Sequence, residues 1–161
     1  MNDSVTETKE SNQPYTRELD LPPFPVSVAL AIGEDEWIQI CEKNEFKDRT
    51  WMADNSLGEV SGMGSVVVVR FADLSSYDII KRAGVCAHEA VHVFQALCQY
   101  INETEPSTEF AAYYVQAITQ WLLKELECSL SQVSTSSSQE QQSSQESLDS
   151  TSSETGEQAA S

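Results

Sequence analysis

The sequence predicts an α+β domain in which a small β-sheet packs on a long helix and on a second helix that follows it antiparallel. Short segments rich in β-branched residues are typical of strands, and two later segments repeat apolar residues every three or four positions, as helices do. All of these segments lie in the middle of the 161-residue chain, and both ends are polar. This length is enough for one domain with a modest core.

The first half of the domain is expected to hold two strands, one short helix and a long loop. Val26–Ile32 alternates larger and smaller residues, which predicts a half-buried strand. Glu34–Asn44 has apolar residues at helical spacing and acids in its first turn, which favours a short helix. Phe46–Gly64 holds three glycines and is predicted as loop, with at most a hairpin arm around Thr50–Met52. Four consecutive valines in Ser65–Phe71 then indicate a buried strand.

The second half predicts two helices. Ser75, followed by Asp78 three residues later, is a helix-start signal, so a long helix is expected over Ser76–Tyr100. Ser107 can cap the next helix, over Thr108–Glu127. The apolar positions expected to face the core are Ile80, Ala83, Ala87, Val91 and Phe94 in the first helix, and Phe110, Tyr114, Ala117, Ile118, Trp121 and Leu122 in the second.

Composition divides the chain into three parts. Residues 1–20 are polar and expected to be flexible, residues 21–128 form the domain, and residues 129–161 are a Ser, Gln and Glu-rich acidic tail that is expected to be disordered. The net charge of −17 excludes nucleic acid as a partner, because a polyanion would be repelled. The chain shows no signal peptide and no membrane-spanning stretch, so a cytoplasmic protein with free thiols is expected.

The segment His88-Glu89-Ala90-Val91-His92 carries the chemistry. Histidines at positions i and i+4 project from one face of a helix, so two imidazole nitrogens can bind one Zn²⁺ ion. Glu89 lies beside them as a general base for a water molecule activated by that ion. His88 and His92 are also the only two histidines of the chain. We therefore predict a zinc site at His88 and His92.

A catalytic zinc ion usually has three protein ligands, so Glu, Asp or Cys must supply the third. Glu103, Glu105 and Glu109 follow the motif. Glu109 is preferred, because it falls in the first turn of the helix that returns antiparallel to the motif helix. Glu103 and Glu105 fall in the connecting loop and stay as alternatives.

Hydrolysis also needs a group that stabilises the developing oxyanion. With no further histidine, a tyrosine hydroxyl is the candidate, and Tyr113 lies one turn after Glu109. Tyr114 and Tyr100 are weaker candidates. Gln95, three residues after His92, is placed to orient a metal ligand.

These residues resemble the zincin metallopeptidases, and among them the gluzincins, whose third ligand is a glutamate on a following helix. The resemblance implies two histidine ligands, a general base at Glu89 and a glutamate ligand at Glu109. The stretch HEAVHVFQALCQYINETEPSTEFAAYYVQAITQ also resembles small phage-encoded proteins with this motif, and the likeness covers about residues 65 to 125. The chain departs from larger gluzincins in lacking a second lobe, an extra histidine and an acidic residue at the position of Tyr113.

Three functions follow as expectations, and the sequence favours the first two over the third, a small interaction domain that binds no metal. The first is a minimal zinc-dependent metallopeptidase that cuts a peptide or protein substrate, paired as an extended chain with the strand Ser65–Phe71. The second is a zinc-binding phage accessory or structural protein without turnover. A phage gene would place the protein in the host cytoplasm. An intact Glu89 favours the enzyme, because a purely structural site needs no base.

Overall fold

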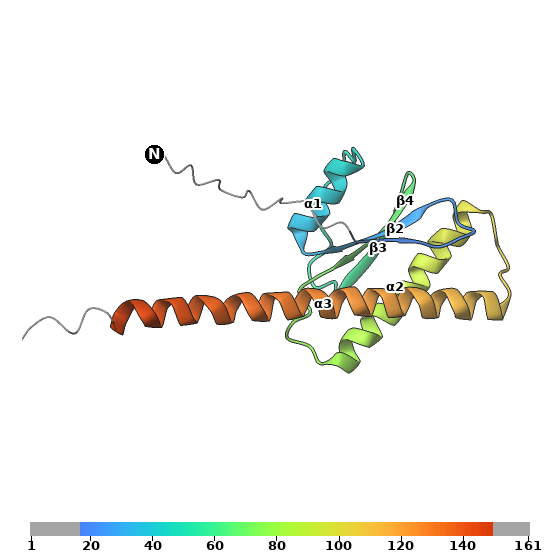
Figure 1. Cartoon of the computed structure of the whole chain (residues 1–161). Helices are drawn as coiled ribbons and strands as arrows, with labels where there is room; N and C mark the ends of the chain where they lie inside the picture. Colours follow the sequence, from blue (N-terminus) through green and yellow to red (C-terminus); the bar gives the residue numbers. More distant parts are fainter. Residues whose placement is uncertain (1–16, 150–161) are drawn as a thin grey trace, which may run out of the picture.

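A four-stranded mixed sheet forms the centre of the fold (Figure 1). The computed structural model describes residues 17–149, with side chains described through residue 132. The order in the sheet is β1-β2-β4-β3, with β2 and β4 parallel and the two outer strands antiparallel to their neighbours. The predicted α+β class is confirmed. The elements in chain order are β1 (Arg17–Asp20), β2 (Ser27–Ile32), α1 (Glu34–Lys43), β3 (Gly58–Met63), β4 (Val66–Phe71), α2 (Ile79–Tyr100) and α3 (Thr108–Asp149).

Helices cover both faces of this sheet: α1 lies on one face, and α2 with α3 lies on the other (Figure 1). The side chains of β4 alternate between the two layers, as a strand requires. Val67 and Val69 point into the larger core under α2 and α3, and Val66 and Val68 into the smaller core under α1. Because both sides are buried, the strand reads as an unbroken run of valines.

The helices α2 and α3 pack antiparallel and close the larger core. Leu97 of α2 and Ile118, Leu122 and Leu126 of α3 are fully buried between them and the sheet. Burying one such side chain contributes about 1.5–3 kcal/mol. The predicted core face of α3 is therefore confirmed at its central positions.

The long helix begins three residues later than predicted, and it buries a different face. Asp78 is its N-cap, and the Asp78 carboxylate accepts a hydrogen bond from the backbone N–H of Lys81 at 2.8 Å. Three of the five residues predicted to face the core are exposed: Ile80 is 81 % exposed, Val91 is 40 % exposed, and Ala87 is exposed as well. The buried face instead consists of Val85, Cys86, Glu89, Ala90, Val93, Phe94, Leu97 and Cys98.

The prediction of a loop over Phe46–Gly64 is wrong for its second half, where β3 lies. A two-residue turn joins β3 to β4, and Gly64 adopts φ 60° there, which a residue with a side chain rarely does. Gly58, Val60 and Gly62 point toward α2, and Glu59 and Ser61 point away from it. The glycines that suggested a loop are the positions where the helix comes close.

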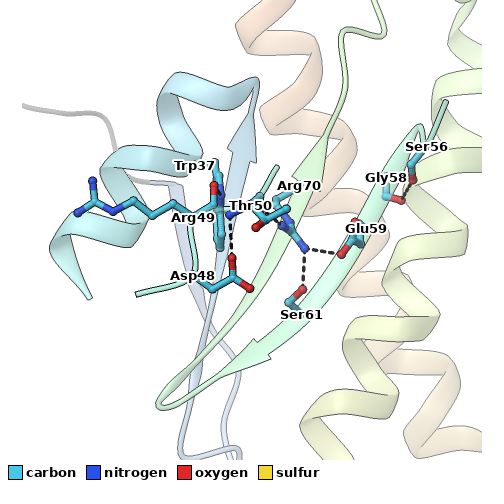
Figure 2. Close-up of polar contacts among 9 residues, drawn as sticks. All are labelled: Trp37, Asp48, Arg49, Thr50, Ser56, Gly58, Glu59, Ser61 and Arg70. Carbon is cyan, nitrogen blue, oxygen red and sulfur yellow. Dashed lines mark hydrogen bonds and ion pairs between the residues drawn. The ribbon is translucent and has the colours of Figure 1, made fainter. Parts of the chain in front are cut away.

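A buried arginine ties β3 to the α1 side of the sheet (Figure 2). Arg70 of β4 is 5 % exposed, and its guanidinium lies 4.6 Å from the ring centre of Trp37. It donates hydrogen bonds to Glu59 and, at 2.7 Å, to Ser61, both on β3, and to the carbonyl of Thr50 at 2.9 Å. Because one side chain binds two residues of β3, the position of this strand is well defined.

Two elements extend past the predicted limits of the domain, residues 21–128. The sheet begins at Arg17, four residues before the predicted start at Leu21, and Arg17 pairs with Glu36 of α1. Helix α3 runs to Asp149, well past the predicted end at Glu127, so it includes residues 129–149 of the predicted tail. The rest of that tail, residues 150–161, lies outside the described residues. Within residues 17–149, none of the helices is long and apolar enough to cross a bilayer.

Candidate metal centre

The two histidines of the motif converge on the exposed side of α2. The Nε2 atoms of His88 and His92 lie 3.1 Å apart, and the two rings are inclined at 76°. Two Zn–N bonds of about 2.05 Å at a tetrahedral angle place the two nitrogens about 3.3 Å apart. The observed separation corresponds to an angle of about 98° at such an ion, so the pair fits zinc as two of its ligands.

Gln95 contacts one ring of the pair. Its side-chain oxygen lies 3.3 Å from Nδ1 of His92. An amide oxygen can only accept a hydrogen bond, so Nδ1 carries the ring proton and Nε2 presents its lone pair. A partner that selects this tautomer is what a metal-binding histidine needs.

Glu89 lies on the inner side of the pair, against the sheet. Its side chain is only 5 % exposed, and an added Cβ at Gly58 of β3 would lie 2.8 Å from both the Cγ and Oε1 atoms of Glu89. Burial raises the pKa of the Glu89 carboxyl, and the neighbouring histidines lower it in part, while Glu59 raises it further. No lysine or arginine of the described chain pairs with Glu89. A raised pKa makes the Glu89 carboxylate a stronger proton acceptor, as a general base requires.

A groove runs along α2 past these residues, with β3 as its opposite wall. Its central pocket has a volume of about 450 Å³ and is lined by Gly58, Glu59, Val60, Gly62, His88, Glu89, His92, Gln95, Ala96 and Gln99. A second pocket, of about 470 Å³, shares Gln95 and Gln99 with the central one and reaches the loop after α2. The candidate site is therefore a groove along α2.

The residues of β3 in this groove were missed by the sequence analysis, which treated them as loop. A signal for them exists in the segment Gly58–Met63. Small or apolar residues alternate there with polar ones, and this period of two is typical of a strand. Glycines at alternate positions further indicate that another element approaches closely.

The structure does not bring Glu109 to the histidines. Phe110 packs on Phe94 of α2, with ring centres 5.9 Å apart, and Phe94 lies two residues after His92, about 200° around the helix. The helix α3 returns antiparallel as predicted, but it packs against the face of α2 that points away from the histidines, and none of its residues lines the central pocket. Among the described residues, no set of three His, Cys, Asp or Glu side chains is placed to hold a metal ion.

Glu103 and Glu105, the alternative third ligands in the loop after α2, also lie away from the two histidines. Glu103 lines the far end of the groove, beside Gln99, and its carboxylate accepts a hydrogen bond from the backbone N–H of Glu105 at 3.0 Å. Neither residue lines the pocket at His88 and His92. Within residues 17–132, the two histidines come together without the third ligand that the sequence predicted.

The candidate tyrosines have separate surroundings. Tyr113 is 68 % exposed on α3 and does not line the pocket. The Tyr114 hydroxyl donates to the carbonyl of Pro22, and its ring packs on Phe24 and Phe110, so it is a packing residue. Tyr100 is nearest to the groove, because an added Cβ at Gly62 would lie 3.3 Å from its hydroxyl.

Three of the four cysteines lie in the core. Cys41, Cys86 and Cys98 are buried free thiols, and Cys128 is an exposed one. Burial raises the pKa of Cys86 to about 12. A thiol held in its neutral form is a poor metal ligand, so Cys86 adds nothing to the histidine pair.

No model of a known protein family matches the chain, and neither a curated protein nor a solved structure matches it. The resemblance to gluzincins therefore remains a prediction, and a function for this protein can be inferred only from the geometry of the groove.

Proposed function

We propose that this protein is a zinc-dependent hydrolase of peptide bonds that acts in the groove between α2 and β3. The observation that carries the proposal is the convergence of two imidazole nitrogens at 3.1 Å, beside a buried carboxyl group, at the centre of that groove. Metal-ligand geometry, a proton acceptor and space for an extended substrate occur together at one place.

Each residue has a distinct role in this proposal. His88 and His92 hold the ion through Nε2, and Gln95 keeps the His92 ring in the required tautomer. A bound zinc ion would lower the pKa of a water molecule and polarise the substrate carbonyl. Glu89 takes a proton from the water whose oxygen adds to the carbonyl carbon. It then gives that proton to the amine nitrogen as the C–N bond breaks.

The substrate is proposed to pair with β3. The strand β4, which the sequence analysis favoured for this role, has no free side, because β2 and β3 flank it. In the described sheet β3 is an outer strand, and its residues form the wall of the groove opposite the histidines. An extended peptide that adds to this edge would lie across Glu89.

A zinc-binding protein without turnover is the second candidate, and the incomplete ligand set favours it. Within residues 17–132 the pair has no third His, Cys, Asp or Glu partner. Two protein ligands bind zinc more weakly than three, so metal content after purification is a poor test. Zinc must instead be titrated into the chelator-treated protein.

The decisive experiment compares four forms of the full chain: wild type, His92→Ala, Glu89→Gln and the control Glu105→Gln. Zinc affinity is measured by calorimetry, and hydrolysis with a mixture of quenched fluorescent peptides. We expect one zinc per wild-type chain and a loss of affinity of roughly 100-fold in His92→Ala. Glu89→Gln should keep zinc and lose hydrolysis by about 10²–10⁴-fold, and Glu105→Gln should match wild type.

Three results would change the proposal. A wild type that binds no zinc, even when zinc is supplied in excess, removes the metal site. Hydrolysis by Glu89→Gln at the wild-type rate would show that Glu89 is not the general base. Zinc binding by the wild type without hydrolysis of any peptide in the mixture establishes the second candidate.

A further inference from the structure

The groove extends past the histidines in the other direction, toward the start of α2. A pocket of about 580 Å³ adjoins the central one and shares Gly58, His88 and Glu89 with it. Its remaining walls come from two places, the first turns of α2 and the residues just before β3. They are Ser56, Leu57, Ile80, Lys81, Gly84 and Val85.

The walls of this pocket differ in chemistry from the rest of the groove. Leu57, Ile80 and Val85 present apolar side chains, and Lys81 can lay its alkyl stem along them. The Ile80 side chain is 81 % exposed, and Ile79 beside it is 49 % exposed. Large apolar side chains left open beside a candidate site indicate that a ligand covers them.

Gly84 makes room in this pocket. It lies inside α2, where glycine is about 1 kcal/mol less favourable than alanine. An added Cβ at Gly84 would meet no atom within 4 Å, although the residue lines the pocket. Packing against a neighbouring element therefore does not require a glycine here. The lack of a side chain at Gly84 instead leaves the floor of the pocket open.

From these features we infer that the pocket at Gly84 selects substrates that carry a large apolar side chain, of the size of leucine or phenylalanine, close to the bond that is cut. This inference rests on the proposed function and specifies its substrate class. Gly84 precedes His88 by one helical turn, about 6 Å along the axis. One residue of an extended peptide spans about 3.3 Å, so the selected side chain lies one or two residues from the cut bond.

The test uses Gly84→Leu, which fills the pocket, and Gly84→Ala, which narrows it slightly. Both should fold, because the added atoms enter open space and improve the helix. The control is Ala112→Leu, which adds the same side chain to an exposed position on α3. Thermal melting and zinc titration of all the variants establish that any change in specificity is local.

The first measurement is the ratio of kcat/KM for two peptides that differ only in having leucine or alanine at the selected position. We expect wild type and Ala112→Leu to prefer leucine by roughly tenfold or more. Gly84→Leu should lose most of that preference, through a lower kcat/KM for the leucine peptide. An unchanged ratio in a folded, zinc-binding Gly84→Leu would overturn the inference and leave the proposed function standing.

The second measurement does not depend on hydrolysis. The protein labelled with ¹⁵N is titrated with N-acetyl-leucine amide or N-acetyl-alanine amide, and backbone amide shifts are followed by NMR. The leucine compound should shift the signals of Leu57, Gly84 and Val85 in wild type, and it should leave those of Leu57 and Val85 in place in Gly84→Leu. The alanine compound should shift none of them in either protein. If no peptide is cut, the proposed function fails. In that case these shifts alone test whether the pocket binds a large apolar side chain. Their absence in wild type would refute this inference.

Discussion

The close contact between Gly58 and Glu89 gives a prediction that can be tested without a known substrate. In Gly58→Ala the new methyl group would lie 2.8 Å from Cγ and Oε1 of Glu89, well inside contact distance. Either the carboxylate or the strand β3 must move. Hydrogen bonds from Arg70 to Glu59 and Ser61 hold β3, so we expect the Glu89 side chain to move.

The expected change in stability follows from two opposing terms. Replacing glycine by alanine within a strand favours folding by about 0.5–1 kcal/mol. Forcing a methyl group into a filled space costs about 1–3 kcal/mol. The net loss in Gly58→Ala should be about 1 kcal/mol, the middle of the range that these two terms leave, and it lowers the melting temperature of a domain of this size by roughly 4 °C.

Two other glycines of the groove serve as matched controls. An added Cβ at Gly62 would lie 3.3 Å from the Tyr100 hydroxyl, at the free end of a long side chain, and one at Gly84 would meet nothing within 4 Å. Urea unfolding of the three alanine variants should therefore rank Gly84→Ala as the most stable, Gly62→Ala as intermediate and Gly58→Ala as the least stable. If Gly58→Ala were as stable as Gly84→Ala, the packing of Glu89 on β3 described above would be incorrect.

Two further predictions concern the ligand set and a buried thiol. Glu109→Ala should leave the zinc affinity within about twofold of wild type in a calorimetric titration, because α3 does not line the pocket. A loss of affinity as large as that of His92→Ala would show that Glu109 is a ligand after all. Burial raises the pKa of the Cys86 thiol from 9.0 to about 12. Above pH 9 the unfolded chain therefore loses a proton that the folded chain keeps. The free energy of unfolding should fall as the pH rises from about 9 to about 12. Cys86→Ala should show a shallower fall over the same range in urea unfolding, and equal slopes would exclude this contribution.

Much of the architecture follows from local sequence patterns. The valine run, the helical repeats and the Ser107 cap predict elements whose existence depends on nearby residues, and Ser107 does accept a hydrogen bond from the backbone N–H of Phe110 at 3.2 Å. The approach of the two histidine rings is local as well, because a spacing of four residues on a helix places them one turn apart. The sequence by itself therefore predicted the motif helix and the pair that it presents.

The wall of the groove and the completeness of the ligand set were decided by the tertiary structure. In the sequence, the glycines of β3 argue against a strand, because glycine weakens strands. In the folded protein the same glycines permit the close approach of α2, and Gly58 makes room for Glu89. The position of Glu109 depends on which face of α2 the returning helix covers. Burial of Phe94 and Phe110 decides that, through contacts between residues far apart in sequence. Local periodicity determines which elements form, but only the packing of one element on another determines which side chains meet.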